Sequence, residues 1–228
     1  MDAAPNLKAK VANTSSKKFK EINVIRLIVG IMQTNCYIVF DNFKKCMIID
    51  PGDDAEYIKN EINRLELTPT AIIATHGHFD HAMSAFDLQV SYNIPFYMSK
   101  KDYLILISSL KNSKKFFNFD PGPPPHKIKF ISENVLEIEK FNIRIFETPG
   151  HTPGSITIYI KDSGILISGD LIFEGSQVGR YDFYYSNKSD LFKSIKNILK
   201  FNGDTIVYPG HGKSFRLKNF KYARMNLY

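Results

Sequence analysis

The stretch "ATHGHFDHAM", residues 74–83, places three of the six histidines of a 228-residue chain within six consecutive positions, together with an aspartate. These four metal-capable residues are His76, His78, Asp80 and His81. They follow the apolar run "AIIA" (71–74), so they begin where a buried strand is predicted to end. Side chains at the carboxyl ends of strands in α/β proteins project into ligand-binding crevices. Because neutral imidazole and carboxylate groups are good ligands for zinc and similar metals, the stretch predicts a metal site rather than structural histidines.

Three further metal-capable residues stand at predicted strand ends, each beside a glycine or proline that permits a tight turn. His151 lies in "TPGHTPGS", Asp170 ends "ILISGD", and His211 lies in "YPGHG". Seven donors for two metal ions, with Asp170 bridging, give each ion three or four protein ligands and leave a position open for solvent. Open coordination is typical of catalytic rather than structural metal sites. The remaining histidine, His126, lies in a proline-rich loop and is predicted to be a surface residue.

The composition indicates one globular domain, which we expect to span residues 21–228. Hydrophobic residues make up 43% of the chain and aromatic residues 13%, and no apolar run approaches the roughly 18 residues that a membrane span requires. Two cysteines, Cys36 and Cys46, are too few for a disulfide framework, which favours a reducing, cytoplasmic compartment. Residues 1–20 carry little apolar surface and are interpreted as a disordered basic tail or an added segment, with organellar targeting as the alternative.

The net charge of +7 is compatible with nucleic acid or an anionic small substrate as partner. The lysines are spread along the chain in pairs, with no run of five or more, so the charge indicates neither a nucleic-acid surface nor a membrane surface. No oligomeric state follows from the sequence.

Short runs rich in Ile and Val alternate with segments of helical periodicity from residue 23 onward. Helices are predicted within 55–67, 101–110 and 189–201. Strands are predicted within 23–29, 35–40, 45–50, 70–76, 95–99, 143–149, 155–161, 164–170 and 204–210. This mixture predicts a layered α/β domain with helices packed outside sheets.

The ordered set "THGHFDH", "TPGHTPGS", "SGD" and "YPGHG" resembles the metallo-β-lactamase superfamily over roughly residues 23–228. The resemblance implies an αββα sandwich with a binuclear metal site at one edge of the two sheets. It also implies that His76, His78 and His151 hold the first ion. The second ion would be held by Asp80, His81 and His211, with Asp170 between the two.

Finer features resemble the short, single-domain type of the glyoxalase II (hydroxyacylglutathione hydrolase) branch. These are "QTNCYIV" (33–39), "IIDPGDD" (48–54), "GDLIFEGSQVGRYDF" (169–183) and the terminal "ARMNLY" (223–228). In that branch a basic residue contacts glutathione at the place that Arg180 occupies here. An internal ion pair of Arg180 with Asp182 or Asp170 is the alternative interpretation.

The resemblance implies hydrolysis of a thioester, with S-lactoylglutathione or a related hydroxyacylglutathione as substrate. A metal-bridging hydroxide would attack the carbonyl, and Asp80 would orient this nucleophile and shuttle its proton. Two divalent ions per chain are expected, with zinc favoured and iron or manganese as alternatives.

Three other functions compete with thioester hydrolysis. A persulfide dioxygenase of the same superfamily would use one iron held by His76, His151 and Asp170. A tRNA-processing nuclease would fit the charge, but the sequence contains no added RNA-binding arm. A metal-stabilised binding module would leave open coordination unexplained.

Overall fold

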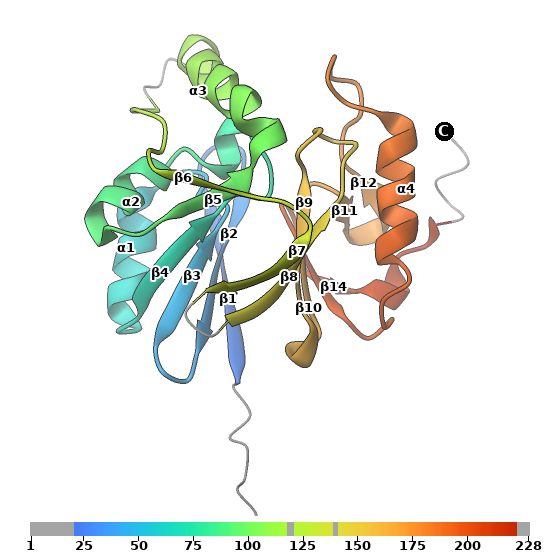
Figure 1. Ribbon diagram of the computed structural model, residues 1–228, viewed down its shortest axis with the longest axis horizontal. Coiled ribbons are helices and arrows are strands. Elements are labelled where there is room, and N and C mark those ends of the chain that lie inside the picture. Colours follow the sequence, from blue (N-terminus) through green and yellow to red (C-terminus); the bar gives the residue numbers. More distant parts are fainter. Residues whose placement is uncertain (1–20, 118–120, 139–140, 223–228) are drawn as a thin grey trace, which may run out of the picture.

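The computed structural model describes residues 21–117, 121–138 and 141–222. The predicted tail, residues 1–20, and the terminal "ARMNLY" motif lie outside these residues. Two mixed sheets of six strands each make up the centre of the described chain (Figure 1). Within the described chain, no helix is both long enough and apolar enough to cross a membrane.

The strands of the first sheet follow one another in sequence order. They are β1 (Ile22–Val29), β2 (Thr34–Asp41), β3 (Lys45–Ile49), β4 (Thr68–Ile73), β5 (Phe96–Ser99) and β6 (Ile128–Ile131). The first three strands pair antiparallel, whereas β3 to β6 are parallel. Parallel pairing requires crossover connections, and the helices α1 (Ala55–Arg64), α2 (Ala85–Tyr92) and α3 (Tyr103–Phe117) lie in them.

The second sheet has the order β14-β13-β10-β9-β8-β7. Its strands are β7 (Asn134–Ile138), β8 (Phe141–Glu147), β9 (Ile156–Ile160), β10 (Ile165–Gly169), β13 (Ile206–Pro209) and β14 (Phe215–Arg216). Only β10 and β13 pair in parallel, and α4 (Lys188–Ile198) lies in the connection between them. A small hairpin of β11 (Ile172–Phe173) and β12 (Gln177–Val178) precedes α4. The helices α1 and α2 lie outside the first sheet and α4 outside the second, whereas α3 lies at the upper end of the first sheet in the view of Figure 1.

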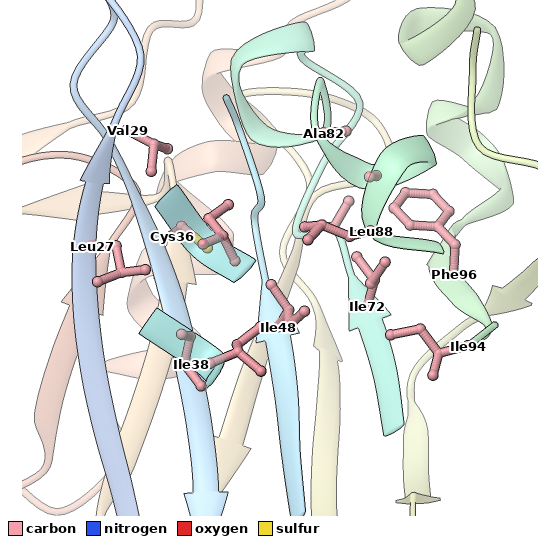
Figure 2. Close-up of a cluster of buried hydrophobic side chains, with 14 of the residues drawn as sticks. Leu27, Val29, Cys36, Ile38, Ile48, Ile72, Ala82, Leu88, Ile94 and Phe96 are labelled. Carbon is pink, nitrogen blue, oxygen red and sulfur yellow. The ribbon is translucent and has the colours of Figure 1, made fainter. Parts of the chain in front are cut away.

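Three buried clusters fill the spaces between the four layers, because both faces of each sheet are apolar. In β2, Cys36 and Ile38 face the helices of the first sheet, whereas Tyr37 and Val39 face the second sheet. Figure 2 shows the first of these clusters, between the first sheet and its helices. The third cluster packs α4 against the outer face of the second sheet. The fold is therefore the αββα sandwich that the sequence predicts.

Most predicted elements are present, with shifts of a few residues at their ends. The helix predicted within 101–110 starts later and runs to Phe117. A 3₁₀ turn of three residues, Phe79–His81, follows the strand that ends before the first histidines. The sequence analysis did not predict α2, β6, β7, β11, β12 or β14, which are short and carry too few residues to establish a periodicity. His126 is exposed, as expected. Both cysteines are buried free thiols.

Candidate metal centre

Seven candidate donors meet where strand ends of both sheets lie side by side. His76, His78, Asp80 and His81 follow β4 of the first sheet. His151 follows β8, Asp170 follows β10 and His211 follows β13, all in the second sheet. The two sheets are joined at this end, because the backbone N–H of Asn35 donates to Gly210 at 2.8 Å and Thr34 forms a β-bridge with His211.

Three imidazole nitrogens form the first group of donors. His78 Nδ1 lies 3.0 Å from His76 Nε2 and 3.0 Å from His151 Nε2. The opposite nitrogen of His151, Nδ1, donates to the carbonyl of Arg180 at 2.8 Å, so its Nε2 carries a lone pair toward the group. His78 Nε2 lies 2.7 Å from the Tyr185 hydroxyl. Hydrogen bonds of this kind fix the tautomer and the ring orientation of histidines that bind metals.

The second group consists of Asp80, His81 and His211. Asp80 Oδ2 lies 3.5 Å from His81 Nε2 and 3.4 Å from His211 Nε2. The Asp170 carboxylate lies between the two groups, since its Oδ2 is 3.6 Å from both His151 Nε2 and His211 Nε2. Each of these triads has ligand atoms within 4.8 Å of one another, close enough to share one ion.

Two buried atoms in this centre support the presence of cations. His81 Nε2 and Asp170 Oδ1 are buried and make no hydrogen bond with the described residues. A buried polar atom without a partner costs about 1–3 kcal/mol, so such atoms are rare unless a ligand satisfies them. A Cβ atom at Gly210 would lie 2.0 Å from Asp170 Oδ1, and only glycine permits this approach. The donors therefore fit one or two divalent ions.

The electrostatics of the centre separate its histidines into two kinds. Burial, reinforced by the neighbouring His151, lowers the pKa of His78 to about 3, and burial also lowers the pKa of His76. These two rings are neutral and ready to bind a metal. Burial opposes protonation of His81 as well, but three carboxylates outweigh it and raise its pKa to about 10. A proton on His81 and a divalent ion would therefore compete for the same carboxylates.

Asp50 is the most important residue of the centre that the sequence analysis missed. This fully buried carboxylate accepts a hydrogen bond from His81 Nδ1 at 3.0 Å and one from the Thr75 hydroxyl at 2.7 Å. Thr75 has a single hydroxyl proton, so its oxygen accepts from His76 Nδ1 at 3.1 Å. Asp50 thus fixes the tautomer of one histidine in each group. Its place in "IIDPGDD" was noted only as a family feature.

A cavity of about 640 Å³ opens onto the centre and is lined by donors from both groups. One wall is α3, which contributes Ile105, Ser108 and Asn112. The opposite wall contains Phe183, Tyr184 and Tyr185, and the Phe183 and Tyr185 rings are stacked with centroids 5.4 Å apart. The aromatic run after Arg180, a kind of cluster that in sequence is more often packing, therefore lines this cavity.

Arg180 lies at the opening of the cavity rather than beside the donors. Its guanidinium makes two hydrogen bonds of 2.9 Å to the Asp182 carboxylate and lies over the Phe183 ring, 4.4 Å from the centroid. Both side chains of the ion pair are about two thirds exposed. The internal ion pair expected as the alternative is therefore present, and Arg180 also lines the cavity.

Two six-stranded sheets with histidines and aspartates at one shared edge define a class of metal-binding αββα proteins. Residues 29–211 match the family described as the metallo-beta-lactamase superfamily, and the chain belongs to this superfamily. The probable metallo-hydrolase YqgX of Bacillus subtilis is 34% identical, covering 82% of this chain and 89% of that protein. The hydroxyacylglutathione hydrolase GloC of Haemophilus influenzae is 32% identical, covering 84% and 91%.

Solved structures with similar folds include two of comparable size. The B3 metallo-beta-lactamase BLEG-1 is 32% identical with a TM-score of 0.79, covering 86% of this chain and 95% of that chain. The protein TTHA1623, solved in a di-iron-bound form, is 29% identical with a TM-score of 0.79, covering 86% and 96%. These similarities identify a metallo-hydrolase fold.

Proposed function

We propose that the protein is a binuclear metal-dependent thioesterase that hydrolyses a hydroxyacylglutathione such as S-lactoylglutathione. The observation that carries this proposal is the convergence of seven donors, two triads with Asp170 between them, at a substrate-sized cavity. The similarity to GloC over most of both chains supports the choice of substrate.

The residues of the centre fit two ions. His76, His78 and His151 would hold one, and Asp80, His81 and His211 the other, with Asp170 shared. Divalent ions in such a site supply an activated water at neutral pH and polarise the carbonyl that is attacked. Zinc is the expected metal from its preference for imidazole and carboxylate ligands. The di-iron form of TTHA1623 makes iron the principal alternative.

Asp80 is proposed as the catalytic residue that orients the attacking water. Its Oδ2 accepts a hydrogen bond from the Thr34 hydroxyl at 2.9 Å, which fixes the carboxylate at the edge of the cavity. Burial opposes its ionisation, but the adjacent His81 and His211 hold the pKa of Asp80 below its usual range. A carboxylate that remains ionised aligns a water molecule by accepting its proton in a hydrogen bond. Because a thiolate leaves without full protonation, no strong general acid is required.

The cavity walls are proposed to bind the thiol carrier. The stacked rings of Phe183 and Tyr185 offer apolar area next to the reacting carbonyl. Ser108 and Asn112 of α3 offer hydrogen bonds to an extended peptide-like group. Arg180 at the opening would contact a carboxylate or carbonyl oxygen of glutathione.

Metal analysis combined with parallel assays tests the proposal. Purified protein should contain two divalent ions per chain and should hydrolyse S-lactoylglutathione, with loss of the thioester absorbance. One tightly bound iron, with oxygen consumption on glutathione persulfide and no thioester hydrolysis, would identify the dioxygenase instead. A chromogenic β-lactam serves as the comparison substrate, since the BLEG-1 fold is similar.

A further inference from the structure

Asp102 is a fully buried carboxylate next to the centre, and within the described part of the chain its side-chain hydrogen bonds go to none of the seven donors. It ends the 3₁₀ turn Lys100–Asp102, directly before α3. Its Oδ2 accepts hydrogen bonds from the Gly77 N–H at 2.8 Å and the Thr152 hydroxyl at 2.6 Å. Its Oδ1 accepts from the Gly154 N–H at 2.6 Å. A buried carboxylate requires such donors, because desolvating an unpaired charge is costly.

The three donors to Asp102 belong to the two loops that carry the first metal group. Gly77 is the residue between His76 and His78, in the loop that follows the first sheet's β4. Thr152 and Gly154 directly follow His151, in the loop that follows the second sheet's β8. One carboxylate therefore joins two loops that are about 75 residues apart in sequence and belong to different sheets.

The approach of both loops to Asp102 is close enough to exclude any side chain. A Cβ atom at Gly77 would lie 2.6 Å from the carbonyl oxygen of Asp102, and one at Gly154 would lie 2.6 Å from Asp102 Oδ1. The Ser109 hydroxyl, from the second turn of α3, also donates to the Gly77 carbonyl at 2.8 Å. Both backbone polar groups of Gly77 are thus held from this one segment.

The second metal group is held by other residues. Asp80 accepts from Thr34, and His81 donates to Asp50. Among the hydrogen bonds of the described residues, the side chain of Asp102 reaches Gly77, which stands between His76 and His78, and the loop of His151, but none of Asp80, His81 and His211. The contacts of Asp102 therefore bear most directly on the first group, so a change at Asp102 should act mainly on the first site.

We propose that Asp102 is a positioning residue for the first metal site. It binds no metal and sets the distance between the His76–His78 loop and the His151 loop. This inference rests on the metal centre of the proposed function but not on the identity of the substrate. Residues that support metal ligands typically change metal affinity about 10- to 100-fold when replaced. We expect a loss of this size at the first site and little change in affinity at the second.

Cobalt titration of metal-free Asp102→Asn protein, with a competing chelator, tests the proposal without depending on activity. An asparagine at position 102 has only one acceptor oxygen. Its NH₂ group would therefore face an N–H donor of one loop, and the hydrogen bonding between the two loops would be weaker. The absorption spectra of cobalt-loaded His151→Ala and His211→Ala proteins assign the two binding steps. Asp102→Asn should weaken about 10- to 100-fold the step that His151→Ala abolishes. Thr152→Val, which keeps the side-chain shape and removes the hydroxyl that bonds Asp102 and Ser155, should weaken the same step less.

Asp41→Asn is the matched control for a general loss of stability. Asp41 is also buried and accepts two backbone N–H bonds, but at the end of β2 opposite to Thr34. Asp41→Asn should lower the melting temperature and leave the affinity of both cobalt-binding steps unchanged. Equal weakening of both steps by Asp102→Asn, or none, would overturn the proposal. If Asp102→Asn does not fold, unchanged cobalt binding by Thr152→Val overturns it.

Two further outcomes separate this inference from the proposed function. Wild-type protein that binds two ions but hydrolyses no thioester contradicts the proposed function and leaves Asp102 as a positioning residue. If wild-type protein binds a single ion, both Asp102→Asn and His151→Ala must lower the affinity for that ion, and an unchanged affinity in Asp102→Asn contradicts the proposal.

Discussion

Replacing Arg180 tests how the cavity recognises its substrate. A charge-assisted hydrogen bond from a free guanidinium to a glutathione oxygen contributes about 1.5–3 kcal/mol. Arg180 is not free, because it already makes two hydrogen bonds to Asp182. An exposed ion pair of this kind contributes about 0–1 kcal/mol, which binding of substrate must offset. The net contribution therefore lies between about 0.5 and 3 kcal/mol. The middle of this range, about 1–2 kcal/mol, corresponds to about 5- to 30-fold in KM.

Two variants with opposite expected effects follow from this balance. Arg180→Ala should raise KM for S-lactoylglutathione about 5- to 30-fold with little change in kcat, because the contact lies far from the reacting carbonyl. Asp182→Asn removes the competing carboxylate and should lower KM up to about 5-fold. Neither should change the metal content. Steady-state kinetics on S-lactoylglutathione and on a short thioester without glutathione measure both effects.

The comparison between the two thioesters decides the role of Arg180. A short thioester lacks the glutathione oxygens, so its KM should respond much less to Arg180→Ala. Equal losses on both substrates would refute a glutathione contact. Loss of metal in Arg180→Ala would instead show that the carbonyl contact with His151 depends on this side chain, which would make Arg180 structural.

Three predictions concern the centre itself. Asp170→Ala should weaken both metal ions, measured as metal content per chain after dialysis, because its carboxylate lies between the two groups; retention of two tightly bound ions would contradict the bridging role. Asp50→Asn should weaken metal binding about 10- to 100-fold, measured by chelator competition, and wild-type affinity would show that tautomer control at His81 is dispensable. The pKa of His81 is raised to about 10 from about 6.5, so its stabilisation is present below about pH 6.5 and lost as pH rises through about 10. The melting temperature of the metal-free protein should therefore fall as the pH rises across this range, whereas that of the metal-loaded protein should not. An equal dependence of melting temperature on pH for both forms would refute the competition between proton and metal.

The donors were predictable from sequence because each lies within a short motif at the end of an apolar strand. Four of them stand in six consecutive residues, and glycine or proline marks the other three turns. The layered fold was predictable because β2, β3 and β4 are continuous apolar runs, as strands covered on both faces must be. The strands also gave the positions of the donors, since all seven follow strand ends.

The supporting residues were not predictable, because their roles depend on contacts between distant segments. Asp50 and Thr75 are 25 residues apart, and Asp102 and Thr152 are 50 apart. A single aspartate in "SKKDY" or "IIDPG" has no local pattern that distinguishes a buried acceptor from a surface charge. The Tyr185 hydroxyl that contacts His78 was likewise hidden in an aromatic run, which is more often packing.

The metal donors and the cavity walls lie largely on different segments, which explains why the family alone does not identify the substrate. The donors and their buried supports, such as Asp50, are held by strand ends of both sheets, so the same metal chemistry persists wherever this arrangement is kept. The walls of the cavity include α3 and residues 180–185, of which the Tyr185 hydroxyl contacts His78 and the Arg180 carbonyl contacts His151. Changes in wall side chains such as Ile105, Ser108 and Asn112 alter what enters the cavity and leave the donors in place. Similar folds can therefore carry the names of a lactamase and of a thioesterase. Substrate specificity in this chain must be sought in α3 and the aromatic segment rather than among the histidines.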